Sequence, residues 1–162
     1  DMAEGRWYSI ANMGSRRQAL GVAALHGRVY AAGGYDGASN LSSVERYDPI
    51  ADKWTPLDNM QYQRRGCAAA AALGKVFVLG GHDGTRQHAS VEVYNTYTNA
   101  WSQVAPMGTP RRLLAAATIG GVLYALGGND GTRALASCER YDTAGGAWEE
   151  VRGMAERRQG CA

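Results

Sequence analysis

The side chains best suited to chemistry in this sequence are its arginines, which supply fifteen of the seventeen basic residues. A guanidinium group is planar and binds carboxylates and phosphates through paired hydrogen bonds. Ten arginines gather in short segments that recur along the chain: Arg16, Arg17, Arg64, Arg65, Arg86, Arg111, Arg112, Arg133, Arg157 and Arg158. Such clustering suits a site for an acidic or phosphorylated segment of another protein.

Glycine-rich stretches are the second candidate for chemistry, because loops of this kind can cradle a phosphate. They read GGYDG at 33–37, GGHDG at 80–84 and GGNDG at 127–131. The lysine that would reach a phosphate is missing from them. We therefore expect the glycine pairs to end strands, where neighbouring strands crowd and positive φ is needed, and each Asp-Gly pair to start a turn.

Metal and nucleophile chemistry have little support in the sequence. The histidines, His26, His82 and His88, lack the spacing of metal ligands. The cysteines, Cys67, Cys138 and Cys161, contain no C-x-x-C pair and are expected to be small core residues. Because a nucleophile elbow is also missing, the sequence predicts no enzyme, no metal and no cofactor.

Composition narrows the class of partner and the compartment. The net charge of +2 argues against a dedicated nucleic-acid binder. No stretch approaches the roughly 20 apolar residues of a membrane helix, and the first ten residues lack a signal-peptide pattern. The few, scattered cysteines indicate a reducing compartment, so a cytoplasmic location is expected.

The recurring segments belong to a repeat of 47 residues. Large aromatic residues that recur once per unit are expected to pack in the core, and the chain is one unit used about three and a half times. The period is kept by Trp7, Trp54, Trp101 and Trp148, by the glycine pairs Gly33 and Gly34, Gly80 and Gly81, and Gly127 and Gly128, by Tyr47, Tyr94 and Tyr141, by Glu45, Glu92 and Glu139, and by Arg17, Arg64, Arg111 and Arg158.

One unit has the pattern of four short strands, expected at 19–25, 28–34, 43–48 and 53–57. Four strands in a repeat of 40–50 residues are typical of a β-propeller blade. The predicted divisions are blades at 18–64, 65–111 and 112–158, a preceding segment at 1–17 with a lone outer strand near 6–10, and the start of a further blade at 159–162.

The double glycine, the Asp-Gly turn, V-E-x-Y, W and M-x-x-x-R resemble the kelch repeat. The stretch RRQALGVAALHGRVYAAGGYDGASNLSSVERYDP resembles the propellers of the kelch-like ubiquitin-ligase adaptors. The third unit departs slightly, because YDTAGGAW lacks the usual proline and Cys138 replaces valine. The resemblance implies an all-β kelch propeller of three complete blades, about half of a six-bladed ring. We expect a fragment of a longer propeller. The alternative is self-association of two half-rings.

Propeller topology places the candidate site. The connections from outer to inner strand and from the second to the third strand emerge on one face of an up-and-down propeller. That face holds the ten arginines named above and five acids: Asp36, Asp58, Asp83, Asp130 and Glu156. Its expected net charge is therefore +5, which would attract an acidic or phosphorylated partner segment.

The arginines of this face allow two interpretations. Arg17, Arg64, Arg111 and Arg158 keep the period, so they either bind a partner or pair with the equally periodic glutamates. Residues that break the period are stronger candidates, because structure alone would repeat them. These are Gln18 against Arg65 and Arg112, Tyr35 against His82 and Asn129, and Ser39 against Arg86 and Arg133.

The resemblance implies that this face holds a substrate peptide, with Arg17, Arg64, Arg111, Arg158, Gln18 and Tyr35 at the matching positions. Where His82 and Asn129 replace the aromatic, hydrogen bonding is expected instead of stacking. The expected function is protein interaction, specifically substrate recognition for a cullin-type ubiquitin ligase. The alternative is an actin-binding or cytoskeletal kelch protein.

Overall fold

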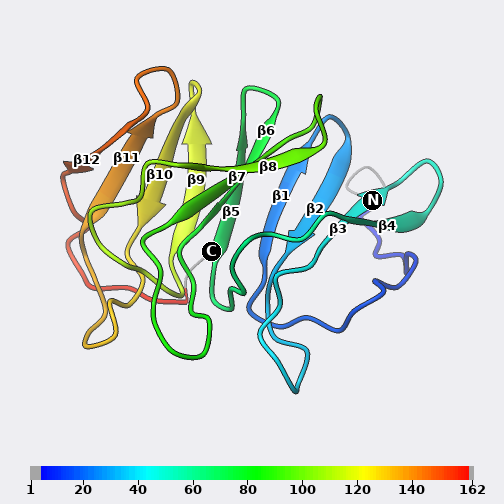
Figure 1. The fold of residues 1–162 in the computed structure, drawn as a ribbon, viewed down its shortest axis with the longest axis horizontal. Helices are drawn as coiled ribbons and strands as arrows, with labels where there is room; N and C mark the ends of the chain where they lie inside the picture. The colour runs from blue at the N-terminus through cyan, green and yellow to red at the C-terminus, as the bar shows by residue number, and fades with distance from the viewer. Residues whose placement is uncertain (1–4, 161–162) are drawn as a thin grey trace.

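The computed structural model describes residues 5–160 and forms them into three four-stranded antiparallel sheets (Figure 1). The strands are β1 (Gly21–Leu25), β2 (Arg28–Ala32), β3 (Val44–Asp48), β4 (Lys53–Leu57), β5 (Ala68–Ala72), β6 (Lys75–Leu79), β7 (Val91–Asn95), β8 (Ala100–Val104), β9 (Ala115–Ile119), β10 (Val122–Leu126), β11 (Cys138–Asp142) and β12 (Ala147–Val151). The all-β prediction is confirmed. None of the described residues forms a helix long and apolar enough to cross a membrane.

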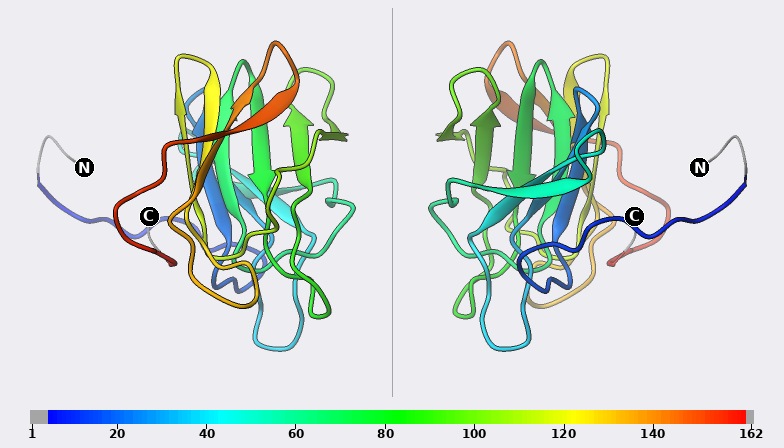
Figure 2. Two further views of the ribbon diagram at one scale, coloured as in Figure 1. Left: turned by 90° about the vertical axis from the view of Figure 1, so that its left-hand side faces the viewer. Right: turned by 90° about the vertical axis from the view of Figure 1, so that its right-hand side faces the viewer.

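Each sheet is one blade, and its strands follow chain order from the innermost to the outermost. Strands β1, β5 and β9 lie side by side at the centre of the row of blades. Short turns occupy one edge of the molecule, at the top of Figure 1, and the long loops with the connections between blades occupy the other. Figure 2 shows these longer segments at the lower edge from both sides. The predicted propeller topology is confirmed.

The core lies between the blades, where facing sheets bury their apolar side chains. Tyr30 of β2 packs against Tyr94 of β7 with ring centroids 6.3 Å apart, and Phe77 meets Tyr141 one interface later at 6.2 Å. The repeated tyrosines are buried, while Trp54, Trp101 and Trp148 are half-buried beside them. Their expected role as core aromatics is therefore confirmed. Cys67 and Cys138 are buried free thiols, as expected of small core residues, and Cys161 lies outside the described residues.

The first of the four periodic tryptophans is not packed like the other three. Trp7 is fully exposed, at 101% of its reference area, and residues 6–10 form no strand. The predicted outer strand near 6–10 is therefore wrong for this structure. At the other end, Gly160 lies outside any strand, and residues 161–162 of the expected further blade lie outside the described residues.

The glycine pairs end the second strand of each blade, as expected, and all six glycines have positive φ. The reason for the crowding differs from the prediction. A Cβ on Gly33 would lie 2.5 Å from the carbonyl oxygen of Arg64, and one on Gly80 would lie 2.2 Å from that of Arg111. The close neighbour is thus the connection entering the next blade rather than an adjacent strand.

The second glycine of each pair also lies against segments that connect one blade to the next. The prediction that adjacent strands crowd this glycine is therefore wrong as well. A Cβ on Gly34 would lie 2.9 Å from Gln18 O, one on Gly81 would lie 3.1 Å from Arg65 O, and one on Gly128 would lie 2.8 Å from Arg112 O. These oxygens belong to the connection entering the same blade. The backbone N–H groups of Gly34, Gly81 and Gly128 point to the connection that leaves it, donating at 2.8 Å to the carbonyl oxygens of Arg64, Arg111 and Arg158 respectively.

Candidate functional site

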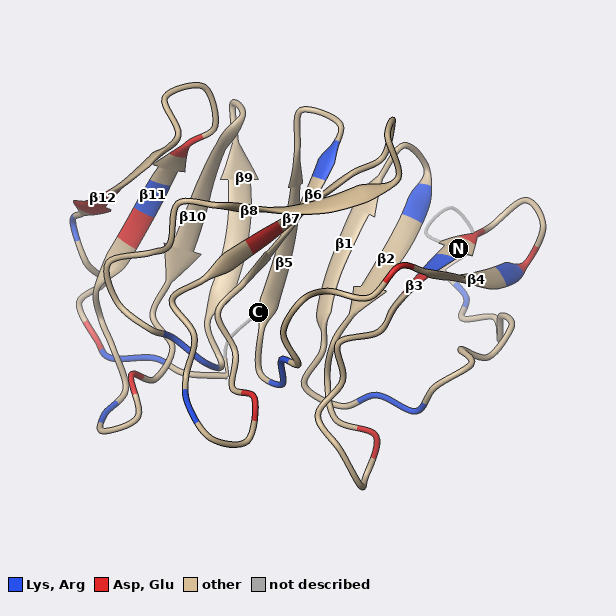
Figure 3. Ribbon diagram, viewed as in Figure 1, with Lys and Arg blue, Asp and Glu red and all other residues tan. Residues whose placement is uncertain are grey.

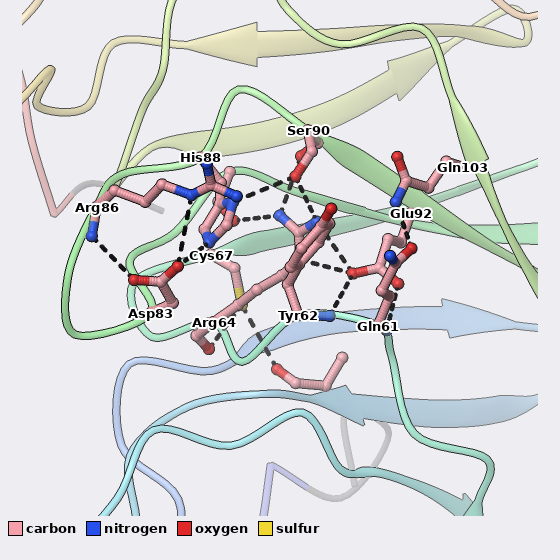
Figure 4. Close-up of polar contacts among 12 residues, drawn as sticks. Gln61, Tyr62, Arg64, Cys67, Asp83, Arg86, His88, Ser90, Glu92 and Gln103 are labelled. Atoms are coloured by element: carbon pink, nitrogen blue, oxygen red, sulfur yellow. Dashed lines mark hydrogen bonds and ion pairs between the residues drawn. The ribbon is translucent and has the colours of Figure 1, made fainter.

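Each blade encloses one arginine in a set of acceptors that we call the arginine socket. In the second blade the socket consists of Gly80, Ser90 and Glu92, and Arg64 fills it (Figure 4). Nη1 donates to the carbonyl oxygens of Gly80 (2.6 Å) and Ser90 (3.0 Å), Nη2 to Ser90 Oγ (2.8 Å) and Glu92 Oε1 (3.0 Å), and Nε to Glu92 Oε1 (3.1 Å). All five guanidinium N–H groups are thereby used.

The other two sockets repeat this geometry. Arg17 fills a socket of Gly33, Ser43 and Glu45, and Arg111 fills one of Gly127, Ser137 and Glu139. The side chains of Arg17, Arg64 and Arg111 are 0% exposed. A guanidinium with no exposed surface cannot reach a partner, so the prediction of these three as partner-binding residues is wrong. Their role is to hold the connection against the blade that follows.

The socket carboxylate also fixes the backbone of the connection. Glu92 accepts from the N–H groups of Gln61 and Tyr62, and Glu45 accepts from those of Gly14 and Ser15. Burial works to raise the pKa of Glu45, but the hydrogen bonds from Gly14 and Arg17 outweigh it and lower the pKa. The carboxylate is therefore held in its charged form at the point where the chain crosses between blades.

The fourth periodic arginine is different. Arg158 lies on the surface, with its side chain 56% exposed, and its ion-pair partner is Glu156 at 3.2 Å. No socket surrounds it among residues 5–160. Among residues 5–160, Arg158 is thus the periodic arginine that fills no socket.

The sockets also change the net charge of the face that carries the loops and the connections between blades. When the three socket glutamates are counted there, ten arginines stand against eight acids, so the expected net charge of +5 becomes +2. Arg86 and Arg133 are exposed, but each lies 3.7 Å from an aspartate of its own loop, Asp83 and Asp130 respectively. The arginines of this face without an ion-pair partner within residues 5–160 are Arg16, Arg65, Arg112 and Arg157. Figure 3 shows basic and acidic segments interleaved along this edge.

A hollow of about 270 Å³ lies where the segments that enter the three blades come together, and it is lined by Gln18, Ala19, Tyr35, Arg65, Gly66, Arg112 and Leu113. Four of its lining residues break the repeat and were predicted from the sequence: Gln18, Tyr35, Arg65 and Arg112. Paired backbone hydrogen bonds join Gln18 to Tyr35, Arg65 to His82 and Arg112 to Asn129. Four predicted residues from three blades thus line one hollow, and His82 and Asn129 are bonded to two of them. We call this hollow and its lining the mouth site.

Two arginines give the mouth site its chemistry. The guanidinium carbon of Arg65 lies 5.5 Å from the centroid of the Tyr35 ring, within the range of a cation–π contact. Arg112 is half-buried, and its Nε has no hydrogen-bond partner among the described residues. Both guanidinium groups therefore retain donors for a carboxylate or phosphate.

The residue after each glycine pair differs from blade to blade, and in each blade it stabilises the turn of its own loop. Tyr35 Oη donates to Gly37 O at 2.9 Å, His82 Nδ1 accepts from Gly84 N–H at 2.9 Å, and Asn129 Oδ1 accepts from Gly131 N–H at 2.8 Å. The aspartate of each turn is bonded as well. Hydrogen bonds from Thr132 and Arg133 lower the pKa of Asp130 to about 2. These loops are consequently held in shape without a partner.

A polar cluster in the second blade was not predicted from the sequence. His88 is 4% exposed and places Nε2 2.9 Å from Asp83 Oδ2, while Tyr62 stacks on its ring at 5.0 Å (Figure 4). Burial lowers the pKa of His88, Arg64 adds to this, and Asp83 opposes it. A signal was present, because the residues one period away are Leu41 and Leu135. A histidine that replaces a core leucine in only one blade marks a local polar feature.

Comparison with known proteins accounts for the repeat. The Kelch motif model matches residues 16–61, 63–108 and 110–155, which is most of the chain. Mouse Kelch-like protein 8 is 46% identical over 44 residues, covering 27% of this chain and 7% of that protein. Mouse Kelch-like protein 35 is 44% identical over 46 residues (28% and 8%), and human Kelch-like protein 24 is 44% identical over 45 residues (28% and 8%). The matched stretch is thus less than a tenth of each relative.

Proposed function

The chain belongs to the kelch family of repeat proteins, and we propose that its mouth site binds an acidic or phosphorylated segment of a partner protein. The family and the fold support a protein-interaction module in general terms. The finer proposal depends on the side chains of the mouth site. The experiments below therefore address those side chains and not the fold.

The observation that carries the proposal is the pair of arginines at the mouth site without ion-pair partners. Arg65 is exposed and Arg112 half-buried, and no carboxylate within residues 5–160 pairs with either of them. Their loops are already ordered by backbone bonds to His82 and Asn129. A site whose donors are held in place before binding loses little conformational entropy when an anion arrives. Gln18 and Tyr35 add a polar and an aromatic surface beside them.

The direct test uses a peptide library in which acidic and phosphoserine peptides are matched by neutral glutamine and serine versions. Arg65→Ala and Arg112→Ala should each weaken binding of the charged peptides by about ten- to a hundredfold, because a charge-assisted hydrogen bond is lost. Arg157→Ala is the matched control, since Arg157 is exposed, unpaired within residues 5–160 and outside the hollow. Equal binding of charged and neutral peptides would refute the proposal.

Higher salt should weaken the same binding, since exposed charges are screened. Arg86 and Arg133 are proposed as secondary contacts, because each would have to leave its own aspartate to reach a partner. Arg158 stays a candidate contact because it is exposed. Substitution of Arg64 or Arg111 is not a test of binding, because either change empties a buried socket.

The identity of the partner class is a further proposal. The resemblance to kelch-like adaptors supports substrate recognition for a cullin-type ubiquitin ligase in the cytoplasm, and the names of the matched relatives agree with that family. Ubiquitylation of a bound protein should then depend on Arg65 and Arg112. Co-sedimentation with filamentous actin that survives both substitutions would instead support the cytoskeletal alternative.

A further inference from the structure

A second hollow lies beside the mouth site, in the loop that joins β6 to β7 of the second blade. It has a volume of about 200 Å³, and we call it the loop hollow. Figure 4 shows four of its lining side chains together. Backbone bridges join Arg65 of the mouth site to His82, and His82 to Gln87, so the stem of one loop separates the two hollows. The second blade has a blade on either side, because β5 contacts both β1 and β9. The lining residues are Tyr62, Arg86, Gln87, His88, Ala89 and Ser90.

The fold of the loop does not require this polar lining. Residues 80–90 of the second blade read GGHDGTRQHAS, and residues 127–137 of the third read GGNDGTRALAS. The backbone is bonded alike in both, since the N–H groups of His88 and Leu135 donate to the second glycine of each pair, at 2.9 and 2.8 Å. Leu135 is buried, so an apolar side chain fits at the position of His88. The polar pair Gln87 and His88 is therefore added to a loop that forms without it.

Both added groups are costly where they lie. His88 is buried with Nε2 2.9 Å from Asp83 Oδ2, and burial lowers the pKa of its imidazole. Gln87 Oε1 is buried without a hydrogen-bond partner among residues 5–160, and a Cβ on Gly131 would lie 2.6 Å from Gln87 Nε2. Buried polar atoms without partners are rare, and departures of this kind concentrate at functional sites. Because Oε1 is unbonded, the amide can turn toward the loop hollow without breaking a hydrogen bond at that atom.

The charges around the loop hollow are balanced. Arg86 lies 3.7 Å from Asp83, and Arg64 is paired with Glu92 in its socket at 3.0 Å. His88 adds no charge near pH 7, because its lowered pKa keeps the ring neutral there. The loop hollow therefore favours a neutral polar group, since an anion would compete with Asp83 for Arg86. The mouth site favours an anion instead, because its arginines have no ion-pair partner within residues 5–160.

The walls of the loop hollow suit a flat group that both donates and accepts. The Tyr62 and His88 rings stack at a centroid distance of 5.0 Å and give the hollow an aromatic side. Nε is the Arg86 atom closest to Asp83, and the side chain is 68% exposed, so its outer nitrogens are left to donate to a carbonyl oxygen. A neutral oxygen does not require Arg86 to leave Asp83. A carboxamide carries donors and an acceptor in one plane, so the amide of Gln87 can pair with another.

We propose that the loop hollow is a second subsite for the partner and takes a side chain that ends in a carboxamide, asparagine or glutamine. This subsite rests on the proposed function, because the residue it takes flanks the acidic or phosphorylated residue bound at the mouth site. Arg86 donates to the carbonyl oxygen of the carboxamide, Gln87 pairs with its NH₂ group, and the Tyr62 and His88 rings flank its plane. A glutamate of the same size is rejected, because it lacks the donor for Gln87. The mouth site thus selects the charge and the loop hollow selects its neutral neighbour.

The first test uses peptides that bind the wild type through an acidic residue and vary only at the flanking positions. Glutamine or asparagine at one flanking position should bind about three- to thirtyfold more tightly than leucine or glutamate there, because two hydrogen bonds are added. The matched variant carries Tyr62→Thr, Gln87→Ala and His88→Leu, which gives all six lining positions the residues of the third blade. It should keep the acidic preference and lose the carboxamide preference. Equal binding of the glutamine, leucine and glutamate peptides by the wild type, or a carboxamide preference that survives in the variant, would overturn the proposal.

A second test does not involve the mouth site. N-acetylglutamine methylamide has no acidic group, and at about millimolar concentration it should shift the NMR signals of the His88 ring and the Gln87 side-chain amide in a saturable way. N-acetylleucine methylamide is the matched control and should shift neither signal. Gln87→Ala should abolish the shift that the glutamine probe causes at His88. If the glutamine probe causes no saturable shift, the subsite is refuted even where acidic peptides bind. Saturable shifts in a protein that binds no acidic peptide would support the carboxamide site and refute only the proposed function.

Discussion

The arginine socket makes a sharp prediction about stability, best tested at Arg64. Arg64→Ala removes a guanidinium whose five N–H groups are bonded and leaves Glu92 buried without its ion-pair partner. Removing one partner of a buried ion pair typically costs about 3–5 kcal/mol. For a chain of this length each kcal/mol lowers Tm by about 2–4 °C. The expected fall in Tm is therefore about 6–20 °C.

The assay is thermal and urea unfolding followed by circular dichroism and tryptophan fluorescence. Arg65→Ala is the matched control, because it deletes the same side chain one residue later and at the surface. Its free energy of unfolding should stay within about 0.5 kcal/mol of the wild type. The pair Arg64→Ala and Glu92→Ala should be strongly coupled in a double-mutant cycle. If Arg64→Ala melted within about 2 °C of the wild type, the structural role assigned to the socket would be refuted.

Three further predictions concern other features of the fold. Gly80→Ala should destabilise the protein by at least about 2 kcal/mol more than Gly27→Ala, because both positions have positive φ but only Gly80 meets a carbonyl oxygen at 2.2 Å; urea unfolding measures the difference. The pKa of His88 is lowered in the folded state, so the wild type should lose stability as the pH falls below the ordinary pKa of histidine, because the unfolded state then binds the proton more readily. His88→Leu should remove this pH dependence of the free energy of unfolding; a loss of stability that persists in the variant would contradict the assignment. Trp7→Ala should leave Tm unchanged because the side chain is exposed, whereas Trp101→Ala should cost about 2–4 kcal/mol.

The periodicity of the sequence was sufficient to predict the architecture. A 47-residue repeat with four strand-like runs has few solutions other than a propeller blade, since each short sheet must bury both faces against its neighbours. The positions of the strands followed from alternating apolar residues and from the glycine pairs. The same rule failed at Trp7, because the residue type repeats there but residues 6–10 form no strand.

The chemical candidates were predicted only in part. Breaks in the period identified Gln18, Tyr35, Arg65 and Arg112, and the structure gathers them at one hollow. The repeat also suggested that periodic arginines and glutamates pair, but it left surface binding equally open. His88 was passed over because a single histidine in place of leucine carries no recognisable motif.

What the sequence alone determined was therefore the repeat, the fold class and the face on which the loops gather. What only the tertiary structure decided was the role of each arginine. Arg64 and Arg65 are identical and adjacent in the chain, yet one is enclosed and the other exposed. The difference arises because Gly80, Ser90 and Glu92, distant in sequence, converge on Arg64 once the blade folds. The burial of Arg64 depends on that convergence, and the sequence around Arg64 does not encode it.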